Sequence, residues 1–169
     1  MSKQHIRLLV VGVDGTAEGD AALAFALDEA ARSGDSVEVV TVWHPLVPAL
    51  SYPVLPVGAT PADREALRRY AEAVQQEALQ RVSVPPGVPV STQVVEGETG
   101  PVLVEAARAA RLLVVGSRAL GYVRAALLGS VSRYCAHHAA VPVVVVPAVQ
   151  PSHEHGSRAL EHVQTATTP

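Results

Sequence analysis

A glycine-rich segment, GSRALGYVRAALLGS over residues 116–130, lies between an apolar run and a stretch with helical periodicity. A helix that begins near Ser130 leaves its first backbone amides without partners, and these amides and the helix dipole favour an anion. Gly129 has no Cβ, so a phosphate can approach closely, while Arg118 and Arg124 can screen its charge. The segment is equally typical of a loop in which Ser130 caps the helix and the glycines make turns. Spacing alone leaves both interpretations open.

Two other segments place polar side chains or free backbone groups after apolar runs. Asp14 follows the run HIRLLVVGV, and a carboxylate that faces phosphates suggests a bridging Mg²⁺ ion, which prefers oxygen ligands. The same DGT sequence is also a turn in which Asp14 or Thr16 only caps the following helix. Near Val42, the backbone N–H and C=O groups at the end of a second apolar run can contact a flat heterocycle.

The elements that must position these segments alternate between strand and helix. Apolar runs predict strands over 5–13, 36–43, 88–97, 111–116 and 143–146. Helical spacing and helix-start signals predict helices over 17–33, 60–82, 99–110 and 130–138. This order predicts an α/β fold, an open five-stranded parallel sheet with helices on both faces in a Rossmann-like arrangement. Ligands of such sheets bind beyond the carboxyl ends of the strands, where all three segments lie.

The remaining segments set the limits of the domain. Residues 44–60 are rich in proline and glycine and are interpreted as a long loop, which is typical of a lid. After Pro147 the pattern ends, so we expect one domain over 1–149 and a flexible tail over 150–169. For the second helix, the residues expected on the apolar face are Leu67, Tyr70, Val74, Ala78 and Val82.

Composition argues against several classes of function. The 169-residue chain has a net charge of -3, 4% aromatic residues and a single lysine, Lys3. Few aromatic residues and no basic stripe argue against nucleic-acid binding. The lack of an interior lysine argues against a Walker A loop and against Schiff-base chemistry. No apolar run is long enough to span a membrane and no signal peptide is evident, so we expect a cytoplasmic protein.

No residue is expected to act as a catalyst. The sole cysteine, Cys135, falls on a helix, and the sequence contains no GxSxG motif. No histidine is expected at the relevant strand ends to act as a general base. His137 and His138 suit the end of a helix, where the dipole favours a cation. The tail sequence HEH over 153–155 is interpreted as incidental rather than as a metal site, because it lacks a rigid scaffold.

Three segments resemble the universal stress protein family, in particular its actinobacterial members: VVGVDGTAEGDAALAFALDEAA, GPVLVEAARAARLLVVGSRALG and LLGSVSRYCAHHAAVPVVVVP. The resemblance covers residues 5–147. It implies a sheet of order 3-2-1-4-5 and a homodimer through the last strand, over Val143, Val144, Val145 and Val146. The apolar run PVVVVP at a sheet edge favours the same contact. The alternative is that the tail folds over this edge. Many members bind ATP, some hydrolyse it slowly, and others bind no nucleotide.

The family pattern of Gly, two residues, Gly, nine residues and Gly-Ser or Gly-Thr implies where a nucleotide would bind. By this resemblance, Asp14 lies near adenine, phosphate and metal, Val42 contacts adenine through its main chain, and Gly116, Gly129 and Ser130 contact ribose and phosphate. ATP is then the expected cofactor, with Mg²⁺ held through Asp14. The candidate binding residues are Gly12, Asp14, Val42, Gly116, Ser117, Arg118, Ala119, Leu120, Gly121, Tyr122, Gly129, Ser130 and Val131.

Two positions depart from the family pattern. The second glycine of the pattern is Ala119, which costs about 1–2 kcal/mol if that position needs a positive φ, although Gly121 is a candidate to take over the kink. Arg111 replaces an acid before the fourth strand and is expected to change only the surface charge. The sequence favours an ATP-binding stress-response regulator or sensor with an unidentified protein partner. The alternatives are a dimeric scaffold of the same fold that binds no nucleotide and, third, a nucleotide-using hydrolase or transferase.

Overall fold

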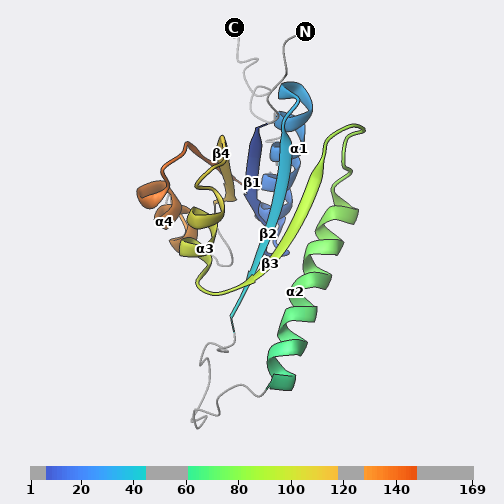
Figure 1. The fold of residues 1–169 in the computed structure, drawn as a ribbon, viewed down its shortest axis with the longest axis vertical. Coiled ribbons are helices and arrows are strands. Elements are labelled where there is room, and N and C mark those ends of the chain that lie inside the picture. The colour runs from blue at the N-terminus through green and yellow to red at the C-terminus, as the bar shows by residue number, and fades with distance from the viewer. Residues whose placement is uncertain (1–6, 45–60, 118–127, 148–169) are drawn as a thin grey trace, which may run out of the picture.

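The computed structural model describes residues 7–44, 61–117 and 128–147, in which strands and helices alternate (Figure 1). The strands are β1 (Leu8–Gly12), β2 (Ser36–Trp43), β3 (Val90–Glu96), β4 (Leu112–Gly116) and β5 (Val143–Val146). The helices are α1 (Ala17–Ser33), α2 (Pro61–Arg81), α3 (Thr99–Ala106) and α4 (Ser130–His138). Neighbouring strands pair in parallel in the order β3-β2-β1-β4-β5, which confirms the predicted fold.

Helices cover both faces of the sheet because the central strands are apolar on both sides. Leu9 and Val11 of β1 pack in one cluster with residues of α1 and α2, whereas Val10 between them packs with residues of α3 and α4. All three side chains are fully buried, as is typical of a parallel sheet. Figure 1 shows the same two layers, with α1 and α2 on one side of the strands and α3 and α4 on the other.

The ends of α1 follow from its sequence. The side chain of Thr16 accepts a hydrogen bond from the Gly19 amide at 3.1 Å, so Thr16 is the N-cap. Gly34 adopts the left-handed conformation at the other end, with φ 71°, where glycine avoids the strain of a Cβ. Both ends agree with the predicted helix over 17–33.

The apolar face predicted for α2 is confirmed in part, because Ala78 is buried and Leu67, Val74 and Val82 are half-buried. Tyr70 is 71% exposed, whereas Ala71, Gln75 and Ala78 are buried. The amide nitrogen of Gln75 lies within hydrogen-bonding distance of the Val39 carbonyl (3.0 Å), the Thr41 hydroxyl (3.2 Å) and the Gln93 carbonyl (2.8 Å). The buried stripe is therefore centred on a polar residue that binds β2 and β3, which a search for apolar spacing misses. The predicted cap at Thr60 lies outside the described residues.

Helix α3 is shorter than the predicted span of 99–110. It ends at Ala106, and the chain then tightens, because the amides of Arg108 and Ala110 bond to carbonyls three residues back, on Glu105 and Ala107. This tightening turns the chain directly into β4.

Arg111 does more than change the surface charge, contrary to expectation. Its Nε lies 2.8 Å from Oδ2 of Asp35 and its Nη2 lies 3.0 Å from Oε1 of Glu29. The Asp35 side chain is buried, and burial alone would raise its pKa. A hydrogen bond from Ser33, another from the Arg7 amide and the two neighbouring guanidinium groups outweigh burial, so the pKa of Asp35 is lowered. This cluster lies at the amino ends of β2 and β4.

Several expectations fall outside the described part of the chain. These are residues 45–60 of the loop predicted over 44–60, the segment over 118–127 and the tail over 150–169. Among the described helices, none combines the length and the apolar character needed to cross a membrane.

Candidate functional site

A cavity of about 630 Å³ lies beyond the carboxyl ends of the central strands. Its volume falls within the range of small-molecule sites, and most of its surface is apolar. It brings together five of the predicted binding residues, on β1, the turn after β1, β2, β4 and α4, with first-turn residues of α1 and α3. The lining residues are Gly12, Val13, Asp14, Thr16, Gly19, Val40, Val42, Tyr70, Thr99, Leu103, Val115, Gly116 and Val131.

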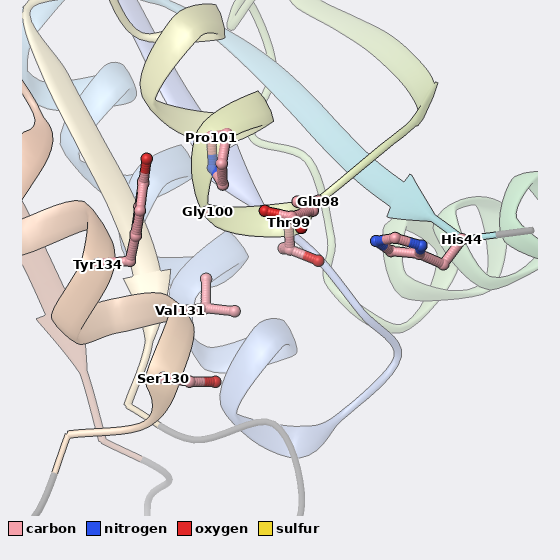
Figure 2. A pocket seen from close by; sticks show the side chains of 8 residues that line it. All are labelled: His44, Glu98, Thr99, Gly100, Pro101, Ser130, Val131 and Tyr134. Carbon is pink, nitrogen blue, oxygen red and sulfur yellow. The ribbon is translucent and has the colours of Figure 1, made fainter. Parts of the chain in front are cut away.

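A smaller cavity of about 300 Å³ adjoins it between the first turns of α3 and α4. Thr99 and Val131 line both cavities, so the two are neighbours. Figure 2 shows Ser130 and Val131 on α4, with the His44 ring directed toward Glu98 and Thr99 from the end of β2. Of the predicted binding residues, Ser130 lines the smaller cavity but not the large one.

The first turn of α4 leaves its amides uncapped. The N-cap is Gly129, not Ser130, and among the described residues no side chain caps this helix. The interpretation of Ser130 as a cap is therefore wrong. The hydroxyl that takes part in the turn is that of Ser132, which donates to the Ser117 carbonyl (3.2 Å) and the Gly129 carbonyl (3.1 Å). The amides of Ser130 and Val131 remain suited to an anion.

Ser117 positions α4 relative to β4 through its backbone. Its amide donates to the Val146 carbonyl, and its own carbonyl accepts from the Gly129 amide, both at 2.8 Å. The first bond joins the end of β4 to β5, and the second joins the two ends of the glycine-rich segment. The candidate residues Arg118, Ala119, Leu120, Gly121 and Tyr122 lie outside the described residues.

Asp14 stabilises the turn into α1 and also lines the large cavity. Its Oδ1 accepts hydrogen bonds from the Thr16 amide (3.1 Å) and the Thr16 hydroxyl (2.6 Å). The turn interpretation is thus confirmed, with Asp14 orienting the capping threonine. The side chain is exposed and, within the described residues, its Oδ2 forms no hydrogen bond, so one oxygen is free to meet a ligand. The described ranges contain no group of three or more His, Cys, Asp or Glu that could hold a metal ion.

Gly12 of β1 and Gly116 of β4 lie where neighbouring residues pack too closely for a side chain. A Cβ on Gly116 would lie 2.9 Å from the carbonyl carbon of Glu18, so glycine lets the first turn of α1 approach the end of β4. A Cβ on Gly12 would lie 2.9 Å from Cδ1 of Leu103. Both positions line the cavity, and both would shift neighbouring atoms if they carried a side chain.

Sequence reasoning missed several residues of this site. His44 follows β2 directly and lines the smaller cavity beside Ser130, which corrects the expectation that no histidine lies at these strand ends. The signal in the sequence that could have identified His44 is its position directly after the second apolar run. Leu103 and Tyr70 lie on helices. The spacing of apolar residues in a helix does not show which part of the molecule each helix face contacts. Within the described residues His44 forms no hydrogen bond or ion pair that would orient its ring.

The side chain of Cys135 is not accessible to solvent. It is fully buried on α4, and burial raises the pKa of its thiol to about 11. The exposed side of the same helix carries Tyr134 and His138, whose rings stack with centroids 4.0 Å apart. Nδ1 of His138 lies 2.9 Å from the Tyr134 carbonyl, which agrees with the expected placement of this histidine at the end of the helix.

Comparison with known proteins identifies the family. The model of the universal stress protein family matches residues 5–147. Curated relatives include universal stress proteins of Mycolicibacterium smegmatis, 34% identical over 82% of this chain and 47% of the relative, and of Mycobacterium tuberculosis, 37% identical over 84% and 45%. The chain therefore spans about half the length of the curated relatives it matches.

Solved structures agree on the fold. UspA from Lactobacillus plantarum has a TM-score of 0.66 at 21% identity, covering 83% of this chain and 97% of that one. A universal stress protein in complex with cAMP has a TM-score of 0.55 at 26% identity, covering 85% and 98%. With the sheet order, the strand-end cavity and the match over 143 residues in agreement, the chain belongs to the universal stress protein family.

Proposed function

We propose that this chain is an ATP-binding stress-response regulator or sensor. The observation that carries this proposal is the strand-end cavity, whose aliphatic part adjoins the uncapped first turn of α4. Val40, Val42 and Val115 offer an apolar surface to the base, and the amides of Ser130 and Val131 suit the phosphates. The related structure in complex with cAMP supports an adenine nucleotide as the ligand.

Mg²⁺ would enter this site with the nucleotide rather than alone. Asp14 is the described carboxylate that lines the large cavity, and its Oδ2 is the oxygen left free by Thr16. One carboxylate oxygen together with phosphate oxygens and water is a common way for proteins to bind Mg²⁺. The candidate contacts from Arg118, Ala119, Leu120, Gly121 and Tyr122 remain part of this proposal.

Hydrolysis of ATP by this site is proposed to be slow at most. A general base must be oriented toward the attacking water. The Asp14 carboxylate is occupied by Thr16 and the proposed metal, and within the described residues no side chain orients the ring of His44. The protein is accordingly proposed to use nucleotide occupancy as a signal to an unidentified protein partner.

A homodimer through β5 is the proposed assembly. Val143, Val144, Val145 and Val146 are half-buried, and they pack alternately against the two core clusters. β5 is an edge strand of the described sheet, bonded to β4 on one side. A second copy of the same strand would cover this apolar edge by a twofold contact. The competing proposal, a dimeric scaffold without nucleotide, keeps this interface and leaves the cavity unused.

Thermal unfolding with and without Mg-ATP separates these two proposals. Ligand at a hundred times its dissociation constant adds about 2.7 kcal/mol to the free energy of unfolding. We expect a clear rise in melting temperature with Mg-ATP and none with Mg²⁺ alone. No rise at millimolar Mg-ATP would favour the scaffold.

Val131→Glu locates the binding at α4. A carboxylate in the first turn suits the helix dipole but repels phosphate, and Val131 lines both cavities. Val131→Gln is the matched control, because it has the same shape without the charge. The rise in melting temperature with Mg-ATP should vanish in the glutamate variant and persist in the glutamine variant. Equal rises in both would place the nucleotide elsewhere.

A further inference from the structure

Tyr70 occupies an unusual position, since its side chain is 71% exposed and yet lines the large cavity. It is the one aromatic residue among the described lining residues of that cavity, in a chain with 4% aromatics. We propose that Tyr70 recognises the base of the bound nucleotide by stacking its ring on the purine. This inference rests on the proposed nucleotide site and names the residue that would favour a purine there.

Helix α2 is anchored so that Tyr70 stays at the rim. One turn further along the helix, Gln75 is buried and bonds to β2 and β3, and its neighbour Val74 packs against the turn at Gly15. A Cβ on Gly15 would lie 2.9 Å from Cγ1 of Val74, so the helix and the β1–α1 turn are in close contact. Tyr70 therefore projects from a fixed backbone beside the turn that carries Asp14.

The placement of Tyr70 complements that of α4. α2 covers one face of the sheet and α4 covers the other (Figure 1), and the cavity is lined by both Tyr70 and Val131. A ligand whose phosphates meet the first turn of α4 can extend its base toward α2. Val40, Val42 and Leu103 add aliphatic side chains to the lining of the same cavity. A flat base would then lie between aliphatic side chains and one aromatic ring.

Stacking at this position predicts selectivity for the base rather than for phosphate. A purine offers a larger flat surface than a pyrimidine, so it gains more from an aromatic partner. Base–aromatic stacking corresponds to about 5- to 150-fold in affinity. The phosphates contact the other end of the site, so their binding should not depend on Tyr70.

Isothermal titration of the full chain with Mg-ATP, Mg-CTP and tripolyphosphate tests this assignment. The variants are Tyr70→Ala and Tyr70→Phe, with Gln80→Ala as a control for an exposed, uncharged position on the same helix. We expect Tyr70→Ala to weaken ATP by at least about fivefold, to reduce the preference for ATP over CTP and to leave tripolyphosphate unchanged. Tyr70→Phe and Gln80→Ala should bind like the wild type.

Three outcomes would overturn the assignment. If the wild type binds ATP and Tyr70→Ala binds it equally well, the stacking role fails while the proposed function stands. If Tyr70→Ala lowers the melting temperature of the ligand-free protein without changing ATP affinity, the ring has a packing role instead. If the wild type binds neither ATP nor tripolyphosphate, the proposed function itself fails.

Discussion

The amide of Gly129 donates a 2.8 Å hydrogen bond to the carbonyl oxygen of Ser117, joining the start of α4 to the end of β4. Ser132 adds a second bond to the same carbonyl from its hydroxyl. Through these two bonds, the backbone that follows the sheet also fixes the first turn of α4. Among the described residues, the first turn of α4 is therefore held in place without a side chain that caps its amides.

Ser132 and Ser130 form a matched pair for testing this arrangement. Ser132 is buried and hydrogen-bonded, so Ser132→Ala should lower the free energy of unfolding by about 1 kcal/mol. Ser130 is exposed and faces the smaller cavity, so Ser130→Ala should leave stability unchanged and weaken Mg-ATP binding. Urea denaturation and nucleotide titration of both variants measure the two effects. The reverse assignment of effects would contradict the account.

Gly116→Ala should reduce stability before any ligand is added. The new methyl group would lie 2.9 Å from the carbonyl carbon and 3.0 Å from the carbonyl oxygen of Glu18, which cannot move without shifting α1. We expect a loss of about 1–3 kcal/mol in the free energy of unfolding, measured by urea denaturation without nucleotide. An unchanged stability with lost ATP binding would instead show that Gly116 matters only as a ligand contact.

Arg111→Met should destabilise the protein without affecting the nucleotide. The substitution leaves the buried carboxylate of Asp35 with weaker compensation, at the end of the sheet opposite the cavity. We expect a loss of about 1–3 kcal/mol, because Ser33 and the Arg7 amide still bond to Asp35. Denaturation measures the loss, and an unchanged dissociation constant for Mg-ATP in folded protein is the control.

Asp35 also predicts an acid dependence of stability. Its pKa is lower in the folded protein than in the unfolded chain, so the unfolded chain takes up its proton first as the pH falls. The stabilisation is complete above the ordinary aspartate pKa of about 4 and is lost as the pH falls through the lower, folded value. Asp35→Asn should flatten this part of the stability profile, measured by denaturation between neutral and acidic pH. A profile as steep as that of the wild type would exclude Asp35 as its source.

Much of the fold could be predicted because its signals are local. Apolar runs such as the one around Val10 identify the buried strands, and Thr16 and Gly34 mark the ends of α1 directly. Gln75 could not be predicted, because a polar residue at the centre of a buried stripe is explained only by the carbonyls it meets on two other strands. The role of Arg111 likewise depends on Asp35, which is distant in sequence.

The candidate site could likewise be predicted from the sequence only in part. Asp14, Val42 and Val131 were predicted because parallel strand ends and the following helix meet at one edge, and the structure places all three on one cavity. For Ser130 the sequence left two roles open, a helix cap or a phosphate contact. The position of the N-cap at Gly129 excludes the first role, and sequence spacing does not give that position. Tyr70 was expected in the core because helical spacing does not show where a helix extends past the sheet.

We propose that a nucleotide binds at the first turn of α4. Amide NMR of isotope-labelled protein titrated with Mg-ATP tests it most directly, because the amides of Ser130, Val131 and Ser132 would change environment on binding. We predict large, saturable shifts at these three amides and near Asp14 and Val42, with little change around Arg111. Saturable shifts confined to another surface, or no shifts at millimolar Mg-ATP, would contradict the account.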